Sequence, residues 1–264
     1  MIKKSLLLIF VLVALHCRLS HAEGDYSVVS NLRNHLVGHW KMNEEQSSYV
    51  DDDSGHELHG VAYRTSIRRG KFTRARYFPS STSSNIVVPK RSPMNFGRKS
   101  FSFAGWLKAE DYAYPHTGFS ARQGFGCYFA PGRLGFTPGW DIGHGHSASN
   151  DYTYICIRDE HQQFVHQRIR HNAGSTGAAL LNKWTHYAVV FDRDAQRVYL
   201  YINGKKQDDY ADISKVKGSI DNKKPLNFGT LYGWKTKGTM DDYRMYNIAL
   251  DNQEVQVIYE DHRV

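Results

Sequence analysis

The sequence has few cysteines, three in 264 residues, and it contains no Asn-x-Ser/Thr motif. Without that motif we expect no N-linked glycan on the chain. Long apolar runs are equally scarce. The clearest one, Leu6 to Leu15, follows two lysines and precedes the small residues of Ser20-His21-Ala22. This order is typical of a secretory signal peptide over residues 1–22, and no later segment approaches the roughly 18 apolar residues of a membrane span. We therefore expect a secreted, extracellular protein without a membrane span.

Two cysteines, Cys127 and Cys156, remain after the signal. In an oxidising compartment an isolated pair most simply forms one disulfide, and two buried free thiols are the alternative. The loop that such a bond closes is about 30 residues long, for which the chain-entropy model gives roughly 3–4 kcal/mol of stabilisation.

Acidic residues are outnumbered by basic ones, and the formal net charge is +8. A basic protein can bind acidic polysaccharides, anionic surfaces or nucleic acid, and export argues against nucleic acid. The densest basic segment is RTSIRRGKFTRAR, Arg64–Arg76. It is either a solvated basic face or a site for a polyanion such as an acidic polysaccharide.

Strand patterns dominate the chain. Residues Phe101–Lys108 alternate large apolar with other side chains, and the β-rich segments Trp184–Asp192 and Arg197–Gly204 are separated by a short turn. These features predict an antiparallel hairpin followed by a tight turn at Asn203-Gly204. Many short strands with 22 glycines indicate a β-sandwich.

Helical periodicity is confined to the C-terminus. There Asp251 can cap a short helix while Glu254 reaches back to it, and Val255, Ile258 and Tyr259 fall on one side.

Four segments, taken in order, resemble the laminin-G-like (concanavalin A-like) jelly-roll family. They are LVGHWKMNEEQSSYVDDDSGHELHG, FSFAGWLK, NKWTHYAVVFDRDAQRVYLYINGK and GTMDDYRMYNIALDNQEVQVIYE. The resemblance implies an all-β, two-sheet antiparallel jelly-roll sandwich with a short C-terminal helix. We expect this domain to span residues 36–264, after a loose lead-in of residues 23–35.

The resemblance also implies a structural calcium ion, since relatives often hold one between the Asp-x-Ser-Gly loop and the closing strand. The matching ligands are Asp53 and Asp241, together with carbonyl groups of residues 53–60. Calcium takes six to eight oxygen ligands, which carboxylates and a loop can supply. A solvated acidic loop is the alternative.

The segment WDIGHGHSASND, from Trp140 to Asp151, carries His144 and His146 with glycines between them. Glycines and the following polar run indicate a rim loop pinned by the disulfide rather than a dedicated metal centre. An exposed Trp140 and the histidines could instead face a ligand, because aromatic rings stack on the apolar faces of sugars. The candidate ligand-binding residues are Trp140, His144, His146, Tyr114, His116 and Arg122.

Catalytic patterns of the superfamily are missing. Its glycoside hydrolases carry Glu-x-Asp-x-(x)-Glu on one strand, whereas Asp159 and Glu160 are adjacent here and would face opposite ways. The lyase patterns Arg-Glu-x-Arg and Gln-x-His are also absent, although FVHQRIRHN, Phe164–Asn172, alternates basic residues. We therefore expect no enzyme.

Fold alone does not fix function. We expect a secreted binding protein that recognises a glycan or a glycosylated extracellular-matrix component. A structural or interaction protein of a matrix, including a biomineral matrix, is the first alternative. An unconventional polysaccharide-active enzyme is the second.

Overall fold

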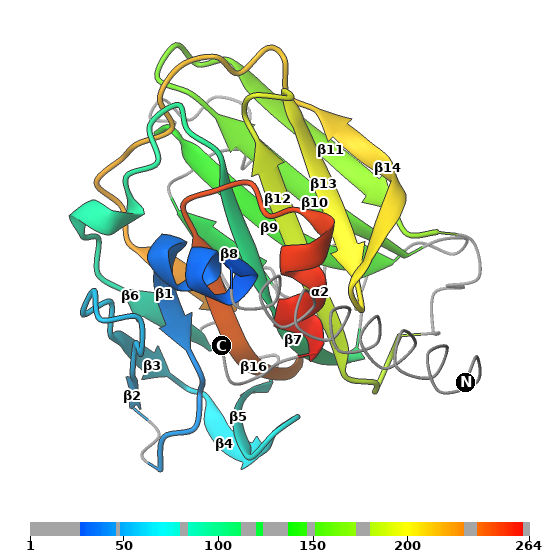
Figure 1. The fold of residues 1–264 in the computed structure, drawn as a ribbon. Coiled ribbons are helices and arrows are strands. Elements are labelled where there is room, and N and C mark those ends of the chain that lie inside the picture. The colour runs from blue at the N-terminus through cyan, green and yellow to red at the C-terminus, as the bar shows by residue number, and fades with distance from the viewer. Residues whose placement is uncertain are drawn as a thin grey trace, which may run out of the picture.

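The computed structural model describes residues 27–45, 48–79, 84–111, 120–123, 137–146, 151–172, 180–229 and 237–260. These residues form two sheets packed face to face (Figure 1). Sheet A has the strand order β14-β13-β12-β7-β16-β5-β4, with β1 paired to β16, and sheet B has the order β11-β10-β9-β8-β15-β6-β3-β2. Every pairing is antiparallel, so the predicted all-β sandwich is confirmed.

The strands of sheet A are β1 (Leu36–Trp40), β4 (Ser66–Arg69), β5 (Arg74–Pro79), β7 (Phe101–Asp111), β12 (Thr185–Asp192), β13 (Arg197–Ile202), β14 (Lys205–Asp212) and β16 (Lys237–Tyr246). The strands of sheet B are β2 (Tyr49–Val50), β3 (Gly60–Tyr63), β6 (Asn85–Val88), β8 (Ser120–Gln123), β9 (Gly139–His146), β10 (Asp151–Arg158), β11 (Phe164–Arg170) and β15 (Leu226–Gly229). The helical elements are residues 27–35, the 3-10 turn η1 (Ser92–Met94) and α2 (Asn252–Glu260).

The main core lies between the two sheets and is rich in aromatic rings. Alternate residues of β7, Phe101 and Phe103, point into it as their spacing predicts. The Phe101 ring stacks on Phe191 of β12 at 4.3 Å between centroids, and Trp140 of β9 packs against both β7 rings. Each of these rings buries a large apolar area, so close ring packing is a main feature of this core.

The outer face of sheet A is covered by two helices, which lie side by side in Figure 1. Residues 27–35 are helical, which corrects the expectation of a loose lead-in, and Leu32 of that helix is fully buried. Leu32 packs in the same cluster as Val255 and Ile258 of α2. Burial of an apolar stripe stabilises a helix too short to form alone. No helix among the residues described is long and apolar enough to cross a membrane.

Two local predictions are confirmed by the backbone. Asp251 and Glu254 form a reciprocal capping box, each accepting the other's backbone N–H at 2.8 Å, and α2 follows directly. Asn203 and Gly204, between β13 and β14, have φ angles of 49° and 78°, as the tight hairpin turn requires.

The prediction that WDIGHGH is a loop is wrong, because these residues form strand β9 in the interior of sheet B. Gly145 pairs with Tyr152 of β10, and a Cβ atom at Gly145 would lie 3.0 Å from the Tyr152 ring. Glycine in a strand often marks such a close approach. Gly145 therefore leaves room for a cross-strand ring and does not mark a turn.

The edges of the two sheets meet where β11 lies beside β14. Backbone N–H groups of the β11 end are not left open: Arg170 donates to the Asp209 carboxylate at 3.0 Å, and Asn172 donates to the Gln207 side chain at 2.8 Å. In return the Asp208 N–H donates to the Asn172 side chain at 2.9 Å. These bonds close one side of the sandwich and protect an edge strand from pairing with another chain.

Candidate functional site

An open aromatic surface lies on the outer face of sheet B, at the end formed by β2 and β3. In β3 the small residues Gly60 and Ala62 face the core, so Val61 and Tyr63 face outward, with exposed fractions of 40% and 50%. Tyr49 of β2 pairs with Val61 and is 42% exposed. Three of the five exposed large hydrophobic side chains among the described residues thus share one surface.

Polar and aliphatic neighbours extend this surface across β6 and β15. Asn85 pairs with Tyr63, Val87 pairs with Val61, and Asn227 of β15 pairs with Val87. All three neighbours are half-buried. We call the set Tyr49, Val61, Tyr63, Asn85, Val87 and Asn227 the tyrosine face.

The chemistry of the tyrosine face suits an amphipathic ligand. Tyrosine offers an apolar ring with a hydroxyl at its tip, and asparagine offers both donors and an acceptor. A sugar ring has apolar C–H faces and a polar rim of hydroxyl groups, so the two surfaces are complementary. Exposed apolar groups that cluster, unlike single ones, mark interaction sites.

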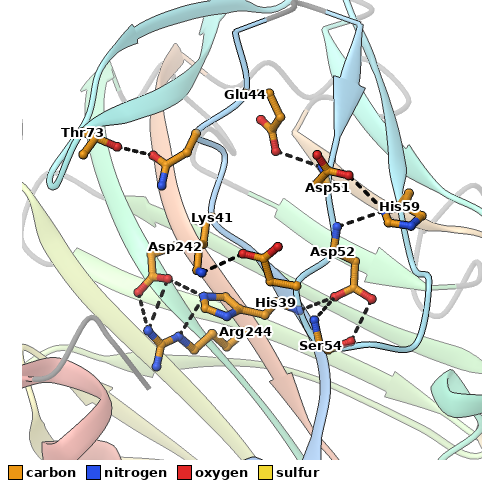
Figure 2. Close-up of polar contacts among 12 residues, drawn as sticks. His39, Lys41, Glu44, Asp51, Asp52, Ser54, His59, Thr73, Asp242 and Arg244 are labelled. Carbon is orange, nitrogen blue, oxygen red and sulfur yellow. Dashed lines mark hydrogen bonds and ion pairs between the residues drawn. The ribbon is translucent and has the colours of Figure 1, made fainter.

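His59 fixes the position of the Tyr49 ring. The two rings stack with centroids 5.6 Å apart and an interplanar angle of 27°. The His59 Nδ1 atom accepts the Asp52 N–H at 3.2 Å and lies 3.3 Å from the Asp51 carboxylate (Figure 2). The imidazole is therefore held from one side by the loop and supports the tyrosine from the other.

Asp52 organises the loop between β2 and β3. One of its carboxylate oxygens accepts the N–H groups of His39 and Ser54 at 2.8 and 3.0 Å (Figure 2). The other accepts the Ser54 hydroxyl at 2.8 Å and the Leu58 N–H at 2.9 Å. A buried carboxylate with four donors ties this loop to β1, and so sets where the tyrosine face begins.

Behind this loop lies a buried charged cluster of His39, Asp242 and Arg244 (Figure 2). The His39 Nε2–Asp242 Oδ1 distance is 2.6 Å, and Arg244 Nη2 donates to the two Asp242 oxygens at 3.0 and 3.3 Å. Arg244 Nε also lies 3.2 Å from His39 Nε2. That nitrogen can either donate to Asp242 or accept from Arg244, and the shorter distance favours donation.

Charge compensation keeps Asp242 ionised. Burial alone would raise the pKa of this carboxyl, but the His39 hydrogen bond and the Arg244 charge outweigh it, so the pKa lies below its usual value. Asp242 has a φ of 52° and sits in a register shift between Asp241 and Arg244. The shift turns the carboxylate toward both of its partners.

The residues predicted to bind calcium have protein partners instead. The Asp53 carboxylate contacts the Lys41 amine at 2.7 Å. Asp241 is buried and accepts the N–H groups of Lys71 and Phe72 at 2.7 and 3.3 Å. Burial raises the pKa of Asp241 to about 7, although these hydrogen bonds oppose the shift. The described residues include no group of three or more His, Cys, Asp or Glu that could hold a metal. The calcium site at Asp53 and Asp241 is not shown by these contacts and stays a prediction.

Trp140 and His144 are buried, which corrects the expectation that they are exposed. Trp140 is in the main core. His144 stacks on Tyr187 at 3.9 Å, and its Nδ1 atom lies 2.9 Å from the Thr153 hydroxyl. The same hydroxyl lies 3.0 Å from His171 Nε2. Neither aromatic side chain presents a face to a ligand in this structure.

Burial shifts both of these histidines toward the neutral form. It lowers the pKa of His144 well below its usual value, with a further contribution from His171, and it lowers the pKa of His171 to about 4. Each imidazole therefore stays uncharged at neutral pH, as a hydrogen-bonded core residue does.

Several predicted site residues cannot be placed in this arrangement. Tyr114, His116 and Cys127 lie outside the described residues, as does the predicted signal peptide. Arg122 and His146 belong to β8 and β9, and only their backbone is described. Cys156 is buried in β10. Its disulfide with Cys127 stays a prediction.

Three of the six basic residues in the segment Arg64–Arg76 contact carboxylates. Arg68 contacts Glu110 at 3.1 Å and Arg74 contacts Glu45 at 3.0 Å. Arg76 is fully buried and contacts Glu44 at 3.2 Å. Of these three arginines, only Arg76 is fully buried in its ion pair, and the other two pairs are partly exposed.

Two packed antiparallel sheets with a short C-terminal helix define a concanavalin A-like sandwich. The chain belongs to the concanavalin A-like lectin/glucanases superfamily, whose family model matches residues 80–256. No curated protein matches the sequence.

Solved toxin domains share the fold. The chain is similar to the binding domain of Paraclostridial Mosquitocidal Protein 1, with 18% identity and a TM-score of 0.64 over 86% of this chain and 52% of that one. It is similar to the binding domain of botulinum neurotoxin serotype D, with 14% identity and a TM-score of 0.66 over 88% and 52%. A third is the binding domain of botulinum neurotoxin DC in complex with SialylT, with 16% identity and a TM-score of 0.65 over 88% and 52%. The chain spans about half the length of each, and at these identities the likeness shows the fold.

Sequence reasoning missed the tyrosine face. The signal was the run GVAY, Gly60–Tyr63, in which small and large residues alternate. An alternation of hydrophobic with polar residues would have indicated which face is open, but all four residues here are apolar or glycine. Only the packed sheets show that the small residues face inward.

The charged cluster generates a stability prediction. Asp242→Asn keeps the side-chain shape and tolerates the positive φ but removes the charge that compensates Arg244. We expect the free energy of unfolding to fall by about 3–5 kcal/mol, because a buried charge loses its partner. Chemical denaturation would measure it. Asp53→Asn, which breaks a half-exposed pair with Lys41, is the matched control and should cost less than about 1 kcal/mol. Equal losses would contradict the assignment.

The buried histidines generate a pH prediction. His171 has a folded pKa of about 4, below the roughly 6.5 of an unfolded histidine, so the unfolded chain binds more protons between these values. The free energy of unfolding should therefore fall as the pH drops from 6.5 toward 4. His171→Gln should make this decline shallower in urea titrations at several pH values. His161→Gln removes an exposed histidine and should leave the slope unchanged, whereas parallel curves for all three proteins would refute the prediction.

Proposed function

We propose that this chain is a secreted lectin-like protein that binds a glycan on the tyrosine face. The observation that carries the proposal is the cluster of Tyr49, Val61 and Tyr63, three large apolar side chains exposed together on an open sheet face. Their rings and the adjacent asparagines supply the stacking surface and the hydrogen-bonding groups that a sugar needs. Export rests on the predicted signal peptide of residues 1–22.

The rigid support of the Tyr49 ring favours a binding site over an exposed surface that has no ligand. The Tyr49 ring is stacked on His59, and the loop that carries His59 is tied down by the four hydrogen bonds of Asp52. Preorganised rings lose less conformational entropy on binding than free ones. Weak glycan ligands gain most from such a site, because they contribute little apolar area of their own.

The family and its structural neighbours are consistent with glycan recognition. The superfamily includes lectins and glucanases by its description, and the similar solved structures are binding domains of toxins. One of those domains is described in complex with SialylT. Identity below 20% and half-length coverage carry the fold but no sugar specificity. We propose binding rather than catalysis because the acidic strand pattern of superfamily hydrolases is missing from the sequence.

Binding to a broad array of uncharged and acidic glycans tests the proposal. A selective set of hits is expected for the native chain, and Tyr49→Ala with Tyr63→Ala should weaken binding to the uncharged hits by about tenfold or more, as loss of stacked rings does. Tyr210→Ala is the matched control, because Tyr210 is 39% exposed but lies in β14 of the other sheet. Equal binding by all variants would overturn the proposed site.

The same array separates the alternatives. A blank array together with retention on an insoluble matrix would favour a structural matrix protein. Time-dependent shortening of a polysaccharide would favour an enzyme. Repeating the measurements in calcium and in a chelator tests the calcium expectation directly. We expect hits that persist in the chelator, because the carboxylates of Asp53 and Asp241 are engaged by protein groups.

A further inference from the structure

A second surface, at the opposite edge of sheet B, carries exposed cations along one strand. In β11 the residues Phe164, His166, Arg168 and Arg170 are all exposed, and Ile169 between the last two is buried in the core. Alternate residues of a strand point the same way, so these four side chains form one line with a spacing of about 7 Å. We call Phe164, His166, Arg168 and Arg170 the arginine strip.

The strip is one strand wide. On the neighbouring strand β10 the residues that face the same way include Tyr152, Tyr154 and Cys156, and these three are buried as a separate cluster. The cations therefore follow the edge of the sheet as a row and do not gather around a point. A row of this shape matches an extended chain of repeated anions better than a single compact anion.

Aromatic rings hold the guanidinium groups on this surface. The Arg168 guanidinium carbon lies 4.6 Å from the centroid of the Tyr152 ring, and beside it the buried Arg158 stacks 4.5 Å from the Phe164 ring and donates to Gln162. Stacking uses the flat face of a guanidinium and leaves its N–H donors at the edge. Those donors form the planar fork that pairs with carboxylate or sulfate oxygens.

Carboxylates contact some of the cations in each basic surface. Arg68, Arg74 and Arg76 are each paired with a glutamate, as described above. Arg168 has no carboxylate partner among the residues that the structure describes. Arg170 contacts Asp209 at 3.4 Å with 72% of its side chain exposed, and such an exposed pair is weak. The positive charge of the strip is thus largely uncompensated.

We propose that the arginine strip binds a linear acidic polysaccharide, with Arg168 and Arg170 pairing with carboxylate or sulfate groups on successive parts of the chain. This surface is separate from the tyrosine face. The two lie at opposite edges of an eight-stranded sheet, on strands β11 and β2 (Figure 1). Seven interstrand steps place them about 30 Å apart. The inference therefore does not depend on the tyrosine face, and each site can fail alone.

Binding to immobilised heparin, used as the probe, tests the inference. We expect Arg168→Ala with Arg170→Ala to lower the affinity by at least about tenfold near 0.1 M salt, since each charge-assisted contact is worth that order. The salt dependence should become shallower, because fewer counterions are displaced. Arg69→Ala with Lys71→Ala removes the same charge from exposed positions in β4 and in the turn that follows it, and should change the affinity less than about twofold.

Equal losses in the two double variants would overturn the inference, because net charge alone would then explain binding. Competition by single-stranded DNA as effective as heparin would also overturn it, since the strip would then be a site for any polyanion. Arg168→Gln with Arg170→Gln replaces the alanine variant if thermal melting shows that the latter is unfolded. The tyrosine variants should keep heparin binding and the arginine variants should keep uncharged glycans, which separates failure of one site from failure of the other.

Discussion

The buried contact between His39 and Asp242 joins the first strand of the sandwich to the last. The register of these strands and the position of the loop after β2 both depend on it. β1 has its sheet partner only in β16, so this contact and the adjacent Arg244 sit where the beginning and the end of the fold meet. A buried ion pair is not a strong source of stability in itself, but breaking it is costly. The cluster therefore acts chiefly to specify one register between distant parts of the chain. Arg244 shares a face of β16 with Tyr246, which packs against the helices, so the same register positions them.

A series of contacts connects this buried cluster to the protein surface. The His39 backbone N–H donates to the Asp52 carboxylate. The same carboxylate also accepts the backbone N–H groups of Ser54 and Leu58. The loop so fixed presents His59 to the ring of Tyr49. An interaction in sheet A thus sets the position of an exposed residue in sheet B. The acidic segment near Asp52 serves this purpose through hydrogen bonds and one lysine contact.

Structural features that depend on residues close together in the sequence could be predicted. The capping box of Asp251 and Glu254 and the turn at Asn203-Gly204 depend on neighbouring residues, and both formed as expected. Gly145 led to a wrong prediction of a loop, because the side chain that leaves no room for a Cβ there, Tyr152, lies on another strand. The four ordered motifs gave the fold class, which the packed sheets confirm. The candidate site could not be predicted, because the tyrosine face exists only once β2, β3 and β6 are side by side.

Which sheet face can bind a ligand follows from where the helices lie. The central outer face of sheet A is occupied by residues 27–35 and α2, and its polar members, among them His39, are buried there. The outer face of sheet B has exposed side chains at both edges: tyrosines on β2 and β3, and arginines on β11. Clustered exposed rings mark an interaction site, and a row of like charges attracts ligands of the opposite charge. The tyrosines and the arginines thus lie at opposite edges of this sheet, separated by the buried residues of β10, and each edge suits a different group of a carbohydrate, neutral rings at the tyrosines and acidic substituents at the arginines.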